Sequence, residues 1–142
     1  MSSTQKARLY LCGPMSNFPQ FNFPAFDEAA AILRGQGMEI INPAEQDSEA
    51  IRVASLESKD GKLIDGKIGG ETWGDILARD IKIVADEVDG IIVLSDWLYS
   101  KGAKLEVACA LITGKPIYEY HTGTGITQLD REWVKSALFA NL

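Results

Sequence analysis

Apolar residues follow two different spacings along this chain of 142 residues. Short runs that are apolar at most positions and are bounded by glycine, proline or asparagine are typical of strands in a parallel sheet. Between these runs, apolar residues recur every three or four positions, which is typical of helices that bury one face. The predicted strands span residues 8–12, 38–41, 90–94 and 115–119, and the predicted helices span 23–35, 72–87, 100–113 and 130–139.

The segment 42–70 has no long periodic pattern. It is polar and contains Gly61, Gly66, Gly69 and Gly70. A connection of this length inside a compact domain is usually functional or mobile. We therefore expect it to be a loop that covers a substrate, with a short helix or strand at 51–56.

Alternating strands and helices predict an α/β fold. We expect one domain over residues 1–142, with a flavodoxin- or Rossmann-like parallel sheet of four to five strands and helices on both faces. In such sheets, ligands bind outside the carboxyl ends of the strands. The loops at 13–22, 42–70 and 95–102 should therefore gather at one edge and form the site.

The composition is that of an ordinary globular protein, with 46% hydrophobic and 24% charged residues. The net charge of −6 and the lack of a Lys/Arg stripe argue against a nucleic-acid polymer as partner, although a single small phosphate can still bind. Residues 1–7 lack the apolar region of a signal peptide, and no segment has the length and apolarity of a membrane span. We expect a cytoplasmic protein without a membrane partner.

Few residues suit metal or cofactor chemistry. Cys12 and Cys109 are expected to be buried free thiols, because no Cys/His spacing indicates a metal site. No P-loop or GxGxxG pattern is present, which argues against a kinase or dehydrogenase, and we expect no cofactor. His121 is the only histidine, and without a nucleophile-elbow pattern a surface role is expected for it.

Glu106 is the most informative residue. It is the only charge between Leu105 and Ile112 in an otherwise apolar helix, and a lone buried carboxylate is costly unless it is paired or used. Gly102 lies one turn earlier on the same face and leaves space above the carboxylate. Ser100 suits the N-cap, where free amides bind phosphate.

A 5-phosphorylated pentose fits this helix start. Four residues of helix rise about 6 Å, so the phosphate can lie at Ser100 while the anomeric carbon lies near Glu106. Either Lys101 or Lys104 can add charge at the phosphate end, or both are merely solvated. The alternative for Glu106 is a carboxylate that reaches the surface or a structural arginine.

The order of these residues resembles the nucleoside 2-deoxyribosyltransferase superfamily over residues 8–119. The resemblance rests on Tyr10-Leu-Cys-Gly-Pro-Met15, on an acid in the helix before the strand 90–94, and on Ser100-x-Gly-x-x-x-Glu106. It implies that Glu106 is the nucleophile that attacks the anomeric carbon, with Tyr10 beside it. It also implies that Asp80 protonates or holds the leaving base. Segment 42–70 departs from the family pattern, and three other residues are alternatives for the acid: Asp75, Asp86 and Asp89.

Serine at position 100 indicates the branch that hydrolyses nucleoside 5′-monophosphates, since an aspartate there would repel phosphate. We thus predict hydrolysis of a (deoxy)nucleoside 5′-monophosphate to free base and 5-phospho-(deoxy)ribose. The alternatives are a base-exchanging deoxyribosyltransferase and a non-catalytic nucleotide sensor. The expected substrate-binding residues are Gly13, Pro14, Met15, Asn22, Trp73, Ser100 and Gly102.

Two further expectations concern aromatic and terminal residues. Phe18, Phe21 and Trp73 either form the base pocket or are ordinary core aromatics. The resemblance implies a homodimer or higher homo-oligomer. For this reason the terminal residues Trp133, Val134 and Phe139 either contact a partner subunit or pack on the domain's own core.

Overall fold

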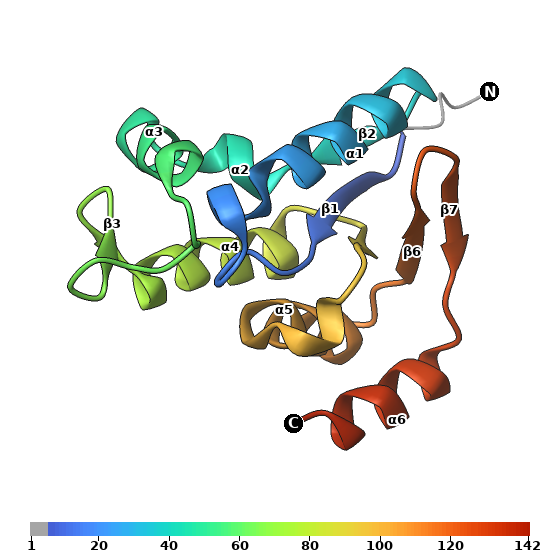
Figure 1. Ribbon diagram of the computed structural model, residues 1–142. Helices are drawn as coiled ribbons and strands as arrows, with labels where there is room; N and C mark the ends of the chain where they lie inside the picture. Colours follow the sequence, from blue (N-terminus) through green and yellow to red (C-terminus); the bar gives the residue numbers. More distant parts are fainter. Residues whose placement is uncertain (1–5) are drawn as a thin grey trace.

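The computed structural model describes residues 6–142 and contains a five-stranded sheet with strand order β2-β1-β5-β6-β7 (Figure 1). The first four of these strands run parallel, and β7 is antiparallel to β6. This confirms the α/β fold with a mostly parallel sheet. The strands are β1 (Arg8–Cys12), β2 (Glu39–Ile41), β5 (Gly90–Val93), β6 (Ile117–His121) and β7 (Gly125–Gln128).

Helices cover both faces of the sheet, as expected. One face packs on α1 (Phe23–Gly35), and the other packs on α4 (Trp73–Asp86), α5 (Lys101–Ile112) and α6 (Arg131–Ala140), as Figure 1 shows. The residues of β1 alternate between the two cores: Leu9 and Leu11 contact the α1 side, while Tyr10 and Cys12 contact the α4–α5 side. This alternation directs the Tyr10 side chain toward α5.

The segment 42–70 is more ordered than the sequence suggested. It contains α2 (Pro43–Gln46) and α3 (Glu49–Glu57), and β3 (Lys67–Ile68) pairs with β4 (Glu71–Thr72) in a separate two-stranded sheet. Residues 51–56, for which the sequence left a helix or a strand open, belong to α3. The segment holds more regular structure than the expected loop with one short element, because Asn42 and Ser48 cap two short helices whose few apolar residues are too sparse to show a period.

Strand β7 was not predicted. Its segment, Gly-Ile-Thr-Gln, contains a single apolar side chain and lies at the edge of the sheet, so it lacks the apolar run that marks a central strand. The other predicted elements have the observed boundaries, as at 8–12 and 23–35, or differ from them by one or two residues. The expectation for residues 1–7 falls mostly on residues 1–5, which lie outside the described residues. Within residues 6–142, no helix combines the length and apolarity needed to cross a bilayer.

The start of α4 is set locally by its sequence. Thr72 Oγ1 accepts a hydrogen bond from the amide of Asp75, and the Asp75 carboxylate accepts one from the amide of Thr72. This reciprocal arrangement satisfies two amides that a helix start leaves free. It also fixes where α4 begins, and therefore which of its residues face α5.

We expect the substitution Ile92→Val to lower the free energy of unfolding by about 0.5–1.5 kcal/mol. Ile92 is fully buried in the α1-side core, so the lost methyl group leaves a small void. Urea denaturation should show a lower midpoint with an unchanged slope. The matched control is Ile64→Val, at a site that is 80% exposed, where a change within about 0.5 kcal/mol is expected. Equal effects at both sites would contradict the assignment of the core.

Candidate active site

A cavity of about 570 Å³ lies beyond the carboxyl end of β1, between α4, α5 and the segment 42–70. The three loops expected at this edge all contribute to its wall, which confirms that they gather at one edge of the sheet. Its lining residues include Gly13, Pro14, Met15, Phe18, Phe21, Asp47, Lys62, Trp73, Asp80, Ser100, Lys101, Gly102 and Glu106.

Glu106 lies at the inner end of this cavity and is only 6% exposed. The fully buried Tyr10 donates a hydrogen bond from its hydroxyl to Glu106 Oε2 at 2.6 Å. The thiol of Cys12, two residues further along β1, donates to the carbonyl of Ala103 at 3.4 Å. None of the described basic residues lies within ion-pair distance of Glu106. The alternative in which Glu106 pairs with a structural arginine is therefore wrong for these residues.

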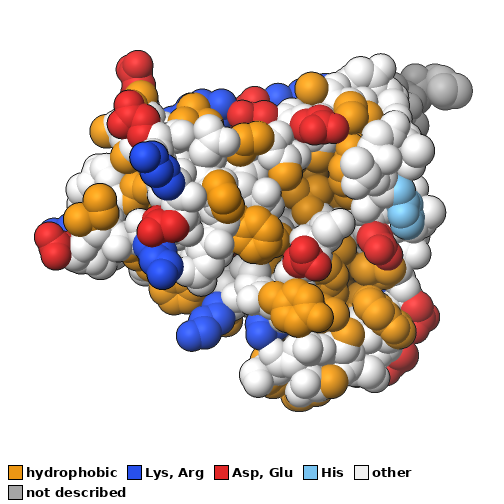
Figure 2. Space-filling model, viewed as in Figure 1, with side chains coloured by type: hydrophobic (Ala, Val, Ile, Leu, Met, Phe, Trp, Pro, Cys, Tyr) orange, Lys and Arg blue, Asp and Glu red, His pale blue; other side chains and the backbone are white. Residues whose placement is uncertain are grey.

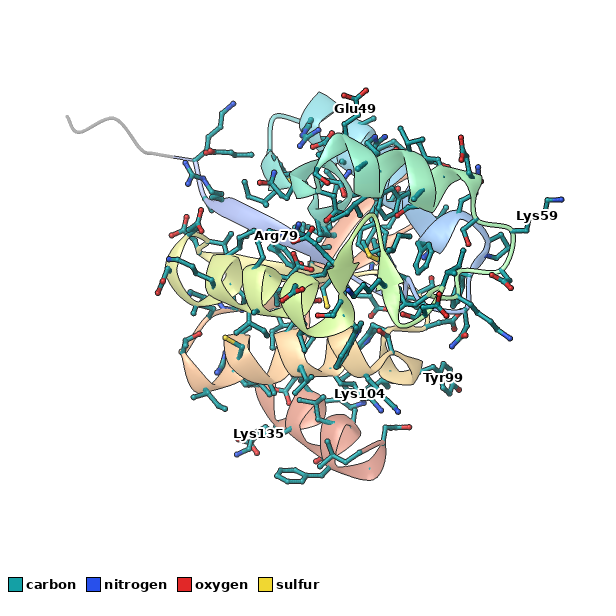
Figure 3. All side chains as sticks on the ribbon, turned by 90° about the vertical axis from the view of Figure 1, so that its left-hand side faces the viewer. Glu49, Lys59, Arg79, Tyr99, Lys104 and Lys135 are labelled. Atoms are coloured by element: carbon teal, nitrogen blue, oxygen red, sulfur yellow. The ribbon has the colours of Figure 1, made fainter. Side chains whose placement is uncertain are left out.

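Asp80 extends from α4 into the same cavity and is also 6% exposed. A single nitrogen of Arg79, Nη2, lies 3.1 Å from Asp80 Oδ1 and 2.6 Å from Asp47 Oδ1. Figure 3 shows Arg79 beside α4 near the centre of that view. One guanidinium therefore serves two buried carboxylates.

Burial raises the proton affinity of both cavity acids. Loss of water, followed by the negative charge of Asp80, raises the pKa of Glu106 to about 8, while the hydrogen bond from Tyr10 opposes the rise. Burial also raises the pKa of Asp80 to about 6, against the opposing effect of Arg79. Around neutral pH the two carboxyl groups together therefore hold one proton. The same burial, with the nearby carboxylates, raises the pKa of Tyr10 and keeps its hydroxyl protonated.

The N-terminus of α5 forms the outer part of the cavity. Ser100 Oγ accepts a hydrogen bond from the amide of Ala103 at 3.2 Å, which confirms the predicted N-cap. A side chain at Gly102 would meet open space, so the glycine leaves this wall free. Lys101 lines the cavity, whereas Lys104 turns away and donates to the carbonyl of Asn141; Figure 3 shows Lys104 on the side of α5 that faces α6.

The loop after β1 is held by close contacts. A Cβ added at Gly13 would lie 3.0 Å from Leu94 Cβ, so only glycine passes the end of β5 without displacement. Asn22 was expected to bind substrate but does not line the cavity. Its amide donates to the carbonyl of Pro14 at 2.9 Å, because the left-handed backbone at Asn22 turns its side chain back toward the loop. Asn22 therefore positions the loop that forms the wall.

The opposite wall depends on Gly61. Its φ of +67° places its backbone against Phe18, where an added Cβ would lie 2.1 Å from the Phe18 carbonyl oxygen. The Gly61 carbonyl accepts a hydrogen bond from the amide of Asn17 at 2.9 Å. These contacts join the loop after β1 to the segment 42–70 and close the cavity on that side.

The structure separates Asp80 from the other acids that the sequence left open. Asp75 belongs to the cap of α4, Asp86 pairs with Lys82 at 3.0 Å, and Asp89 accepts a hydrogen bond from the amide of Arg8. None of these three lines the cavity, whereas Asp80 does. Asp80 and Glu106 therefore line one cavity and Tyr10 contacts Glu106 from behind it, while the catalytic role of all three stays a prediction.

The aromatic, histidine and cysteine side chains considered above lie in different surroundings. Phe18, Phe21 and Trp73 all line the cavity, and Phe21 also belongs to the α1-side core. His121 is exposed and pairs with Thr127, as a surface residue would. Cys109 is only partly buried, whereas Cys12 is fully buried, and both are free thiols.

Sequence reasoning missed three residues of the site: Asp47, Lys62 and Arg79. Asp47 and Lys62 lie in the segment 42–70, where no periodic pattern placed them on any face. Arg79 precedes Asp80 and looks like a solvated helix residue. The available signal was the pairing of a buried acid with an adjacent arginine, since buried carboxylates need a basic partner.

Most of this chain matches one known protein family. Residues 7–119 match the model of a family described as a domain of unknown function, DUF4406. The chain belongs to this family. The match covers β1 through most of β6 and therefore includes every residue of the cavity described above, while β7 and α6 lie beyond it. No curated protein matches the chain.

We expect the free energy of unfolding to fall as the pH rises from about 5 to 9. Folding raises the pKa of Glu106 to about 8 and that of Asp80 to about 6, so the folded protein binds more protons than the unfolded chain in this range. The contribution is full at pH values below the unfolded pKa and is lost as the pH passes about 6 and then about 8. Each proton contributes a slope of up to about 1.4 kcal/mol per pH unit.

The isosteric Glu106→Gln should flatten this decline, because the glutamine side chain carries no ionisable group. Urea denaturation at several pH values measures the slope. The matched control is Glu57→Gln on the exposed face of α3, which should leave the slope unchanged. A decline as steep in Glu106→Gln as in the wild type would show that the cavity acids do not cause it.

Proposed function

We propose that this protein hydrolyses the N-glycosidic bond of a nucleoside 5′-monophosphate. The observation that supports this best is the placement of Glu106 and Asp80, two buried carboxyl groups that line one cavity and share a proton around neutral pH. Such pairs, with one ionised and one protonated member, are suited to cleaving glycosidic bonds through an oxocarbenium-like state. The order of residues that resembles the deoxyribosyltransferase superfamily agrees with this chemistry.

The outer part of the cavity suits a phosphate. The first residues of α5 line it, where a helix start leaves amides free for an anion, and Ser100 can donate its hydroxyl proton while its oxygen caps the helix. Lys101 and Lys62 line the same cavity and bring positive charge. A phosphate here lies more than one helical turn from Glu106, so the sugar can extend along the open wall at Gly102 and bring its anomeric carbon to Glu106.

The reaction then has two steps. In the first, a Glu106 carboxylate oxygen forms a bond to the anomeric carbon while the carbon–nitrogen bond breaks and Asp80 gives its proton to the leaving base. In the second, water attacks the same carbon, its proton passes to Asp80, and the bond to Glu106 breaks. The products are the free base and 5-phospho-(deoxy)ribose.

Charge at the reacting carbon determines where the shared proton lies. In the empty site the pKa of Glu106 is the higher of the two. The positive charge that develops on the sugar favours ionisation of the nearer carboxylate, Glu106, and the Tyr10 hydroxyl stabilises the same form. The proton is then held by Asp80, where the leaving base needs it.

Two other activities use the same residues. A deoxyribosyltransferase would pass the sugar from Glu106 to a second base in place of water, and a sensor would bind the nucleotide without turnover. Incubation with a panel of ribo- and deoxyribonucleoside monophosphates separates them. Base release without an acceptor supports hydrolysis, release only with an added base supports transfer, and tight binding without release supports a sensor.

Cellular location and assembly belong to the same proposal. Nucleotides and reduced thiols are found together in the cytoplasm, where we place the protein. The homo-oligomer stays a prediction. Val134 packs in the core, while Trp133 and Phe139 are exposed, as are Leu105 and Ile112 on α5; the lower part of Figure 2 shows hydrophobic surface in the region of the C-terminal helices.

Glu106→Gln should reduce base release at least 10³-fold while leaving the fold intact, because glutamine cannot form the covalent bond to the sugar. Chromatographic detection of free base measures the effect, and far-UV circular dichroism checks the fold. For the wild type, kcat/KM should be bell-shaped in pH, with limbs near about 6 and about 8. Base release by Glu106→Gln at the wild-type rate would rule out Glu106 as nucleophile.

Ser100→Asp should raise the KM for nucleoside monophosphates at least tenfold more than for the corresponding nucleosides. The added carboxylate repels a phosphate at the start of α5 but can accept a hydrogen bond from a 5′-hydroxyl. The matched control is Ser100→Thr, which keeps the hydroxyl and the cap. Equal losses for nucleotide and nucleoside would place the phosphate elsewhere.

A further inference from the structure

Asp47 carries a buried carboxylate that the glycosidase mechanism does not use. Its side chain is 5% exposed, and the residue lines the cavity together with Asp80 and Glu106. Asp47 Oδ1 lies 2.6 Å from Arg79 Nη2, but the contact lacks hydrogen-bond alignment, and this oxygen accepts no hydrogen bond from the described residues. A buried acceptor of this kind costs free energy unless a ligand satisfies it.

The cations near Asp47 are already engaged. Arg79 divides one nitrogen between Asp47 and Asp80. Arg52, another nearby cation, pairs with Asp27 at 2.8 Å and donates to the carbonyl of Ala44. Among the described residues, none donates a hydrogen bond to Asp47 Oδ1, and a donor on a ligand in the cavity can fill this place.

The position of Asp47 identifies the part of the ligand it meets. Because Asp47 and Asp80 contact the same nitrogen of Arg79, they lie side by side, and Asp80 is the acid at the leaving base. Ser100 and Lys101 hold the phosphate at the start of α5, on a different wall of the cavity. Much of the cavity lining is apolar or aromatic, as a base requires, and includes Phe21, Phe23, Ile51, Trp73, Ile76 and Leu77.

We infer that Asp47 selects the base by accepting a hydrogen bond from an exocyclic amino group, so that the substrates are amino-bearing nucleotides of the cytosine or adenine type. A carboxylate offers only acceptors, whereas uracil and hypoxanthine present a carbonyl oxygen at the corresponding position. A carbonyl oxygen facing the carboxylate would place two acceptors together with no hydrogen between them. A buried site strongly discriminates against a ligand that leaves its polar groups unpaired in this way. This inference rests on the proposed function, since Asp80 defines the base end.

Two pairs of nucleotides that differ in this one group test the inference: dCMP against dUMP, and AMP against IMP. We expect wild-type kcat/KM to favour the amino member at least tenfold in one pair or both. Asp47→Asn, whose amide can donate to a carbonyl, should reduce that ratio at least tenfold. A general loss of rate from disturbing Arg79 affects both members of a pair and cancels in the ratio.

The controls separate recognition from structure. Asp27→Asn removes a neighbouring carboxylate that already has protein partners, and it should leave the ratio unchanged. Asp47→Glu keeps the carboxylate and should keep the sign of the preference; it serves as a second variant if Asp47→Asn does not fold. An unchanged ratio in Asp47→Asn, or a wild-type preference for the keto member in both pairs, would overturn the inference.

Failure of the proposed function gives a different result. In that case the wild type releases no base from any of the four nucleotides, and equilibrium binding of the same intact nucleotides replaces kcat/KM as the measurement. If the wild type binds the amino member more tightly and Asp47→Asn abolishes this preference, Asp47 selects the base in a protein that binds nucleotides without cleaving them. Equal binding of both members, or no binding of either, would show that Asp47 does not select the base.

Discussion

The hydrogen bond from Tyr10 to Glu106 is the contact on which the site depends. It joins β1 to α5 across the core and satisfies a carboxyl group that is almost completely removed from water. Without either partner, the other would remain as a buried polar group with no hydrogen bond, which costs about 1–3 kcal/mol. The same contact fixes the orientation of Glu106, because Tyr10 is enclosed between the sheet and two helices and has no freedom to move.

The acids around the cavity set the second constraint. Asp47, Asp80 and Glu106 line it together, while the one guanidinium within ion-pair distance among residues 6–142, that of Arg79, contacts only two of them. The fold tolerates this excess of negative charge by holding a proton, which is why the pKa values of both Glu106 and Asp80 are raised. Concentrating acids in a dry cavity lowers stability at neutral pH, a cost that proteins commonly accept at sites that perform chemistry.

The region that matches the family contains the whole site. The match to DUF4406 over residues 7–119 includes the whole cavity, while β7 and α6 lie beyond it. These last elements still contribute to the core, because Val134 and Leu138 pack against the same cluster as Tyr10 and Val107.

The sequence by itself determined the α/β fold and the central candidates, because the apolar periods reflect burial directly and because a single acid in an apolar helix, Glu106, is costly without a purpose. It did not reveal β7, whose edge position needs few apolar residues, nor the helices within 42–70, which are too short to show a period. Only the tertiary structure distinguished Asp80 from Asp75, Asp86 and Asp89, because what sets Asp80 apart is that its side chain faces the cavity. The structure was also needed to identify Asp47 and Arg79. They are distant in sequence, and only the fold brings the Asp47 carboxylate against the same Arg79 nitrogen that contacts Asp80.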